Sequence, residues 1–354
     1  MSNTYTCIVC GKQFEWPYPK KICSQQCDSI FKSNAMRAKL QKRWSRVPYK
    51  SKLSDQALDV MHQYNNIHDT SLKQLVTNIL DQIGQSYQLD YTVDGVTYDI
   101  SIPSLQMVMC VDASVNNVAF RDVEDSIYIH RDDSYLKSKH AADHGLRCVH
   151  WYDWDDVFKL PLMLSNPVTV YARNCTVAPV DISESNLFMN MYHLQKARNG
   201  VKVSLGLFHE NDLVQVMTFG HPRFNRNYEW ELYRFCSDPT VRIVGGASKL
   251  FKHFVQQVNP ESIITYCDAA KFTGSVYEKM GMKFRSFTTP SIIWSRGAEQ
   301  MSNNVLSRFR YDGLFGTNYG KDASNQELMI LNGWLPVYNC GQYTYEWHKQ
   351  SPCI

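Results

Sequence analysis

Four closely spaced cysteines near the start of this 354-residue chain most constrain what it can fold into. Cys7 and Cys10 form one close pair, and Cys23 and Cys27 form a second. Each pair can close a tight knuckle around one edge of a tetrahedral zinc ion. So short a segment buries too little apolar surface to fold alone, so the metal would supply the missing free energy. We therefore predict a structural zinc module over residues 1–30, with four unrelated buried thiols as the alternative.

The remaining cysteines are scattered through the chain. There are 11 cysteines in all, an odd number, and no positively charged and then apolar leader precedes them. This pattern predicts reduced thiols in an intracellular protein rather than a disulfide framework. The longest apolar runs are too short to span a bilayer. The cysteines interpreted as isolated are Cys110, Cys148, Cys175, Cys236, Cys267, Cys340 and Cys353.

A basic segment follows the cysteine module. Residues 32–52 contain eight lysines and arginines, no acid, and the interleaved aromatics Trp44 and Tyr49. Such a segment beside a zinc knuckle predicts contact with the phosphates of double-stranded DNA, whereas a solvated helix or linker is the alternative. The residues predicted to contact DNA are Arg37, Lys39, Lys42, Arg43 and Arg46.

The next segment has the pattern of an α/β layer. Apolar spacing over 72–83 predicts an amphipathic helix, and 91–99 and 101–112 alternate or run apolar like two strands. A helix closing at 140–145 and a strand over 146–151 follow. Helix, strand pair, helix and strand together predict a sheet covered by helices.

Motifs in this segment resemble a nuclease family. The stretches Tyr98-Asp-Ile-Ser-Ile-Pro-Ser-Leu105, Leu146–Trp151 and Val170–Cys175 are similar to phage-encoded homing endonucleases of the very-short-patch-repair type, in the PD-(D/E)xK group. The resemblance extends from about residue 70 to the C-terminus. It implies an α/β nuclease domain over 56–165 and a cytoplasmic protein of an infected bacterial host.

An active nuclease of this family holds Mg²⁺ with clustered carboxylates. The resemblance places Asp99 at the metal-binding aspartate, but the next expected acid is Cys110, and the helix acid falls near Lys73 or Gln74. A thiol is a poor ligand for Mg²⁺, and a lysine would repel it. Asp112 could replace the missing ligand from the same strand face as Cys110. These departures, with Tyr135 in place of the usual histidine, favour a decayed centre over an active one.

The third segment, 166–295, resembles the GNAT acetyltransferase core. Strand patterns at 204–208, 213–219 and 262–266 surround Arg242-Ile-Val-Gly245-Gly-Ala247, which is similar to the superfamily's pyrophosphate loop. Small residues there let backbone N–H groups at a helix N-terminus approach phosphate. The alternative is that the glycines only serve a strand–helix turn. The predicted cofactor-binding residues are Arg242, Val244, Gly245, Gly246 and Ala247, with acetyl-CoA as the implied cofactor.

Tyr277 is the candidate general acid of this third segment. The pattern Tyr277-x-x-x-Gly281 matches the position where GNAT enzymes keep such a tyrosine. The segment is also similar to the phage Mom acyltransferase-like enzyme, which implies adenine in DNA as the acceptor. Further candidates for the cleft are His193, Glu229, Glu231, Asp268 and Lys271.

The predicted architecture is therefore α/β throughout. It comprises the zinc module (1–30), a basic linker or helix (31–55), the nuclease-like domain (56–165), the GNAT-like domain (166–295) and a C-terminal extension (296–354) ending in a hairpin. Three functions remain open. They are DNA binding by a decayed nuclease, Mg²⁺-dependent DNA cleavage, and acyl-CoA-dependent transfer to a nucleobase.

Overall fold

The computed structural model describes residues 3–7, 12–16, 21–23, 60, 70–114, 116–119, 121–123, 126–128, 132–302, 313–314 and 325–349. The chain divides into two compact units, one comprising residues 1–52 with 122–128, and the other comprising the rest. Among the described residues of the first unit, β1 (Asn3–Thr6) and β2 (Gln13–Trp16) form an antiparallel hairpin. A short pair formed by β6 (Arg121–Val123) and β7 (Ser126–Tyr128) is the second described sheet there.

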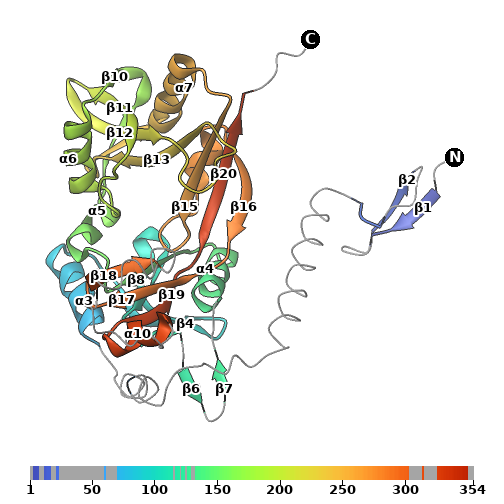
Figure 1. Cartoon of the computed structure of the whole chain (residues 1–354), viewed down its shortest axis with the longest axis vertical. Coiled ribbons are helices and arrows are strands. Elements are labelled where there is room, and N and C mark those ends of the chain that lie inside the picture. The colour runs from blue at the N-terminus through green and yellow to red at the C-terminus, as the bar shows by residue number, and fades with distance from the viewer. Residues whose placement is uncertain are drawn as a thin grey trace. The chain divides into compact units, whose positions relative to one another are not determined.

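A seven-stranded sheet dominates the second unit (Figure 1). Its order is β10-β11-β12-β13-β15-β20-β16, and all neighbours are antiparallel except β13 and β15, which run parallel. The strands are β10 (Thr176–Pro179), β11 (Val201–His209), β12 (Asp212–Gly220), β13 (Trp230–Ser237), β15 (Ser262–Asp268), β16 (Lys283–Thr288) and β20 (Gln342–His348).

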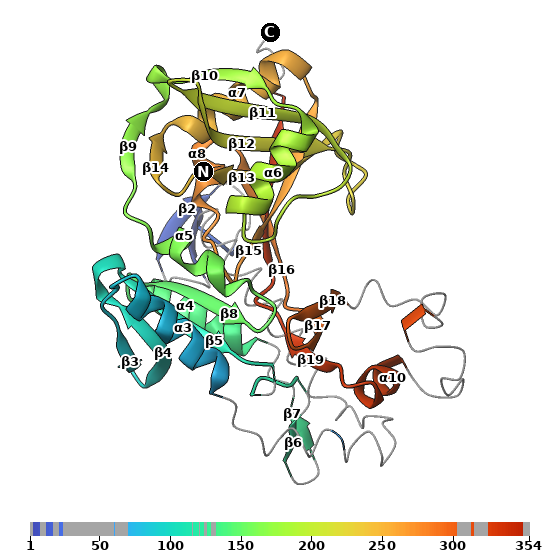
Figure 2. The same cartoon turned by 90° about the vertical axis from the view of Figure 1, so that its left-hand side faces the viewer.

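Helices cover both faces of this sheet (Figure 2). The apolar stripe of α7 includes Phe251 and Phe254, and Phe254 stacks on Phe219 of β12 with ring centroids 3.5 Å apart. On the opposite face, Phe188 and Met189 pack against the sheet. The helices are α6 (Ile182–Tyr192), α7 (Gly246–Val258) and α8 (Ser275–Lys279).

The second largest sheet of this unit has four strands, in the order β3-β4-β5-β8. Its first three strands are antiparallel, and β5 and β8 run parallel. Apolar residues of α3 and α5 cover one face, and α4 covers the other. The elements are α3 (Ser71–Gln82), β3 (Gln88–Val93), β4 (Val96–Ile102), β5 (Met107–Asp112), α4 (Asp133–Asp143), β8 (Arg147–Tyr152) and α5 (Leu160–Leu164).

Smaller elements link the two sheets. A three-stranded sheet ordered β18-β17-β19 is inserted between β16 and β20, and a two-stranded parallel sheet joins β9 to β14. No helix among the described residues is long and apolar enough to cross a membrane. The elements are β9 (Val168–Tyr171), β14 (Val241–Val244), β17 (Ile292–Arg296), β18 (Glu299–Ser302), α10 (Asn325–Leu331), β19 (Leu335–Tyr338), and the 3₁₀ turns η1 (Pro103–Leu105), η2 (Val157–Lys159) and η3 (Ala172–Asn174).

The mixed α/β architecture expected from the sequence is confirmed, with two corrections. The expected strands 91–99 and 101–112 are three strands instead. A turn at Asp94–Gly95 separates β3 from β4, and η1, with Gln106 in a left-handed backbone at φ 48°, separates β4 from β5. The C-terminal segment does not close as a hairpin, since β19 pairs with β17 while β20 lies between β15 and β16. The predicted C-terminal extension therefore supplies an interior strand of the seven-stranded sheet, next to the edge strand β16.

Candidate active site

The parallel strands β13 and β15 diverge and leave a cavity of about 500 Å³ between their carboxyl ends. Their ladder holds only from Trp230 to Leu232 on β13. Beyond that point the Thr265 hydroxyl donates a hydrogen bond to the Leu232 carbonyl at 3.0 Å. The Thr265 side chain thus supplies the hydrogen-bond donor for this carbonyl at the end of the ladder. The residues that follow on both strands line the cavity.

A bulge in β13 explains the divergence. On β12, Thr218 faces Arg234 and the next residue, Phe219, faces Leu232, so Tyr233 is an extra residue in the β13 strand. Such a bulge bends its strand and increases the local twist, which turns β13 away from β15. Because ligands commonly bind outside the carboxyl ends of parallel strands, this cavity is the strongest candidate for an active site.

Tyr277, the predicted general acid, lines the cavity from the first turns of α8. Burial raises the pKa of Tyr277 well above its usual value, so its hydroxyl stays protonated at neutral pH. Arg234 lines the same cavity, and burial with the nearby Arg223 and Arg198 lowers its pKa to about 10. Arg234 therefore remains a cation near Tyr277, where it can stabilise developing negative charge.

Asp268 and His193 also line this cavity. Asp268 is the only carboxylate among the described lining residues, and burial raises its pKa while Lys271 opposes that rise. Its Oδ2 accepts a hydrogen bond from the Gln195 amide at 3.1 Å. Burial and the cations Arg234 and Lys159 lower the pKa of His193 to about 3, so its imidazole is neutral at pH 7.

The two glutamates predicted as candidates for the cleft, Glu229 and Glu231, form hydrogen bonds elsewhere. Glu231 is fully buried, and both of its oxygens accept hydrogen bonds from Arg223. Glu229 accepts a hydrogen bond from the Glu261 backbone N–H at 2.7 Å. Neither carboxylate lines the cavity.

The cavity's cysteines are poor nucleophiles. Burial raises the pKa of both Cys236 and Cys267 to about 12. A thiol with such a pKa carries almost no thiolate at neutral pH. Neither cysteine is therefore a good candidate for a nucleophile in this cavity.

The predicted pyrophosphate loop forms the turn from β14 into α7. Gly245 has a φ of 82°, and a Cβ at Gly246 would lie 2.0 Å from the Gln215 side-chain oxygen. Gly245 lines a separate surface groove of about 480 Å³ with Lys249, Lys252 and His253 of α7. The loop residues are thus gathered at one helix N-terminus, but they do not line the Tyr277 cavity.

A feature that the sequence did not predict lies along this loop. Strand β9 pairs in parallel with β14, so Arg242 faces Thr169 and Val244 faces Tyr171. This pairing occupies backbone hydrogen-bonding groups of β14, the strand that precedes Gly245. In contrast, the backbone N–H groups in the first turn of α7 have no hydrogen-bond acceptor within the helix.

In the four-stranded sheet, the predicted nuclease residue Asp99 lies beside a cation. Its Oδ1 is 3.5 Å from the Lys73 Nζ, and its Oδ2 accepts the Val111 backbone N–H at 2.9 Å. Lys73 also pairs with Asp90 at 2.7 Å. Among the described residues, no group of three metal-binding side chains surrounds Asp99.

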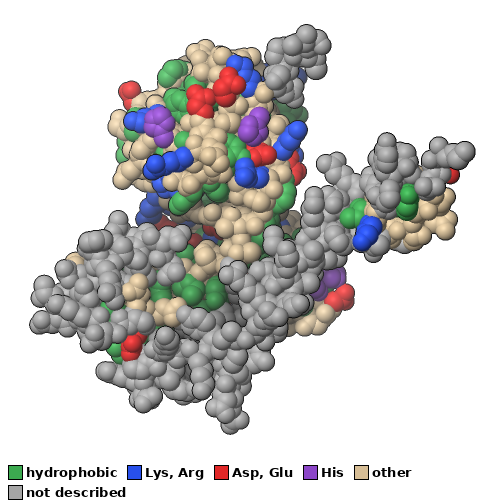
Figure 3. Space-filling view, turned by 45° about the vertical axis from the view of Figure 1, so that its right-hand side comes forward, with side chains coloured by type: hydrophobic (Ala, Val, Ile, Leu, Met, Phe, Trp, Pro, Cys, Tyr) green, Lys and Arg blue, Asp and Glu red, His purple; other side chains and the backbone are tan. Residues whose placement is uncertain are grey.

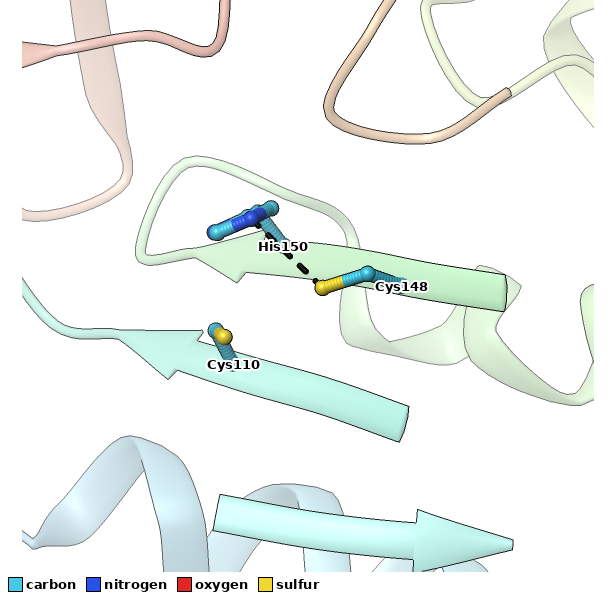
Figure 4. A group of neighbouring side chains, drawn as sticks. All are labelled: Cys110, Cys148 and His150. Carbon is cyan, nitrogen blue, oxygen red and sulfur yellow. Dashed lines mark hydrogen bonds between the residues drawn. The ribbon is translucent and has the colours of Figure 1, made fainter. Parts of the chain in front are cut away.

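Asp112, proposed as the substitute ligand, lies in a different cluster. Its Oδ2 is 2.6 Å from Nδ1 of the fully buried His150. Contrary to the sequence prediction, Cys110 and Cys148 are not isolated but lie beside His150 (Figure 4). The sequence contained a signal for this cluster in the alternation of side chains along a strand. Cys148 and His150 are two residues apart on one strand, as are Cys110 and Asp112 on another, so each pair lies on one face of its strand.

The predicted zinc ligands are only partly described. Cys7 is buried at the end of β1, and the Cys23 backbone N–H donates to its Sγ at 3.5 Å. Cys10, Cys27 and the five predicted DNA-binding residues lie outside the described residues. Over the described surface in Figure 3, lysines and arginines are interspersed with acids and histidines. The zinc module and DNA contact therefore remain predictions.

Comparisons with known proteins match one half of the chain. Neither a protein-family model nor a curated protein matches the sequence. Among solved structures, the ribosomal-protein-S18-alanine N-acetyltransferase from Escherichia coli is similar at 8% identity and a TM-score of 0.29, covering 51% of this chain and 98% of its own. An N-acetyltransferase from Staphylococcus aureus has 14% identity and a TM-score of 0.28, covering 49% and 98%. A GNAT family acetyltransferase from Elizabethkingia anophelis, with acetyl-CoA bound, has 10% identity and a TM-score of 0.29, covering 50% and 99%.

Proposed function

We propose that this chain is an acyl-CoA-dependent acyltransferase whose chemistry takes place in the cavity between β13 and β15. The observation that carries the proposal is the divergence of these parallel strands around a cavity of about 500 Å³ that contains Tyr277 and Asp268. A cavity of this volume accommodates a small ligand and a few convergent polar groups. The sequence resemblance of the Arg242–Ala247 loop to the GNAT pyrophosphate loop supports the same proposal.

The residues of the loop fit a pyrophosphate. Gly245 supplies the positive φ, and Gly246, which packs too closely against Gln215 to carry a Cβ, begins the 13-residue helix α7. A helix N-terminus of this kind favours negative charge. Acyl-CoA would supply a thioester carbonyl that an acceptor amine can attack.

Two side chains in the cavity have the properties that transfer requires. Asp268 would accept the proton that the acceptor nitrogen loses, because a buried carboxyl with a raised pKa is the stronger base. Tyr277 would donate its proton to the sulfur of the departing thiol. Arg234 would stabilise the negative charge that develops on the carbonyl oxygen in the transition state.

Calorimetry with acetyl-CoA and the full chain tests the binding step. We expect saturable binding that Gly245→Glu abolishes, since a carboxylate there repels the pyrophosphate. Gly95→Glu is the matched control, because Gly95 has a similar φ of 79° and open space around it, yet lies in the β3–β4 turn. Failure of the natural chain to bind either acetyl-CoA or free CoA would end the proposal.

Tyr277→Phe tests the chemical step. We expect kcat for acetyl transfer to fall by roughly 10²–10⁴-fold with little change in acetyl-CoA affinity, because a general acid acts only in the reaction. Tyr98→Phe is the control, since Tyr98 is also buried but lies on β4, where its hydroxyl donates to the Lys137 carbonyl of α4. An unchanged kcat in Tyr277→Phe would remove the tyrosine from the mechanism.

For the acceptor, we propose a nucleobase amine. Arg147, Arg234 and the aromatic rings of Tyr192, Tyr233 and Phe272 line the cavity, and such groups suit a planar heterocycle. The predicted basic segment and the Mom-like resemblance point to DNA as its carrier. Transfer of radiolabelled acetyl to plasmid DNA, compared with transfer to a lysine-containing peptide, tests the choice. Label on the peptide alone would contradict it.

A further inference from the structure

A compact cluster of metal-binding side chains lies between β5 and β8, outside the proposed acyltransferase cavity (Figure 4). One ligand atom each from Cys110, Cys148 and His150 lies within 4.8 Å of the other two. The first residue comes from β5 and the other two from the neighbouring parallel strand β8. Cys110 and His150 are fully buried, and Cys148 is 9% exposed.

The spacing of these atoms matches a tetrahedral zinc ion. Zinc bonds of about 2.3 Å to sulfur and about 2.05 Å to nitrogen put the two ligand atoms about 3.6 Å apart. The Cys148 Sγ and His150 Nε2 are 3.6 Å apart. A hydrogen bond between a thiol and an imidazole gives the same distance, so this value alone does not distinguish the two.

The orientation of the imidazole provides a second, independent observation. Nδ1 of His150 is 2.6 Å from the Asp112 carboxylate, which leaves Nε2 to face Cys148. Metal-binding histidines characteristically pair their second nitrogen with a carboxylate, which fixes the ring and raises its basicity. Asp112 therefore holds His150 in the orientation that metal binding needs.

The charge of the cluster also fits a dication. Two thiolates would balance Zn²⁺ in a site too buried for isolated charges. Two sulfurs and one imidazole are soft and borderline ligands, which disfavours Mg²⁺ or Ca²⁺. The Ser138 hydroxyl lies 3.0 Å from Nε2 and marks the side of the cluster where a fourth ligand, either this oxygen or a water, would approach.

We propose that Cys110, Cys148 and His150 bind a structural Zn²⁺ ion that joins β5 to β8, with Asp112 orienting the histidine. The ion replaces the Mg²⁺ centre that the nuclease resemblance implied, since Cys110 stands where that family has an acid. This site is separate from the N-terminal cysteines and independent of acyl transfer.

Zinc content of the full chain, measured by mass spectrometry of the metal, tests the proposal. Cys7, Cys10, Cys23 and Cys27 are first all changed to serine, so that only the internal site is counted. We expect this chain, purified with zinc, to retain about one ion. Adding Cys148→Ser should reduce the content to about one-tenth or less. The matched control is Cys175→Ser, another buried cysteine, which packs in the core of the seven-stranded sheet.

Two further measurements keep the test decisive if Cys148→Ser does not fold. Asp112→Asn should weaken zinc affinity by roughly 10–100-fold while leaving it bound at saturating zinc. Cobalt in place of zinc should give a sulfur-to-metal charge-transfer band together with tetrahedral ligand-field bands. A folded chain that retains no zinc, a Cys110–Cys148 disulfide seen as a loss of two hydrogens by mass, or iron or copper in place of zinc would each overturn the proposal.

Discussion

At the residue scale, one ion pair in the four-stranded sheet bears on the predicted Mg²⁺ centre. The resemblance to nucleases predicts that Asp99 binds Mg²⁺, yet the near neighbour of this carboxylate is the Lys73 ammonium at 3.5 Å. A cation at this distance competes with the metal for the same carboxylate. We therefore expect no plasmid cleavage above background with Mg²⁺ or Mn²⁺, and the same result for Asp99→Ala. Cleavage that disappears in Asp99→Ala would show an active centre after all.

Asp268 gives a pH-dependent prediction at the same scale. Burial raises its carboxyl pKa in the folded chain, against about 3.9 when unfolded. The folded state then binds the proton more tightly, so this residue's contribution to stability falls as pH rises through the interval between the two pKa values. Asp268→Asn should therefore raise the free energy of unfolding at pH 7 and leave it nearly unchanged below the unfolded pKa. Urea unfolding at both pH values measures the difference, with the exposed strand residue Asp212→Asn as control.

At the element scale, local patterns were predictable from the sequence and long-range pairings were not. The apolar spacing of 72–83 predicted α3, because a helix buries its own periodic stripe. The loop at Gly245 was found for a similar reason, since glycines mark a strand–helix turn. The pairing of β9 with β14 and the place of β20 depend on residues far apart in sequence, which no local period records. The sequence predicted Tyr277, His193 and Asp268 for a cleft, but the Tyr233 bulge that opens the cavity has no local sequence pattern.

The substitution Gly341→Ala tests the backbone conformation and packing immediately before β20. Its φ is 80°, and an added Cβ would lie 2.3 Å from the Thr288 backbone oxygen. Gly341→Ala should therefore cost both the strain of the positive φ, about 1 kcal/mol, and the clash with β16. Gly281→Ala is the matched control, with φ 90° and nothing within 4 Å. Chemical denaturation measures the free energy of unfolding of both variants, and the difference between them is the cost of the clash. Equal destabilisation of the two variants would show that the clash with β16 has no cost.

At the scale of the whole molecule, Lys271 connects the two large sheets. It follows β15, and its Nζ donates to the His150 carbonyl and to Asp155, on the β8 side. The ammonium is also 4.6 Å from the centre of the Trp151 ring. With 4% of its surface exposed, this cation belongs to the interior of the unit.

Lys271→Met should consequently weaken the coupling between the sheets. Removing one partner of a buried pair leaves the Asp155 carboxylate uncompensated, and we expect a loss of about 3 kcal/mol. Calorimetry should show a lower Tm and separate transitions for the two sheets, with partial recovery in Lys271→Met/Asp155→Asn. The exposed Lys283→Met serves as control. A single transition at the natural Tm would refute the coupling.

The position of β20 between β15 and β16 also determines the order in which the sheet can be completed during synthesis. β15 ends at Asp268 and its neighbour β20 begins at Gln342, so about 70 residues are translated before the partner exists. At about 5–20 residues per second, the unpaired edge of β15 is exposed for about 4–15 s. Such an edge can pair with other chains. Stalled or truncated products that lack β20 are therefore the forms of this protein most prone to aggregate on the ribosome.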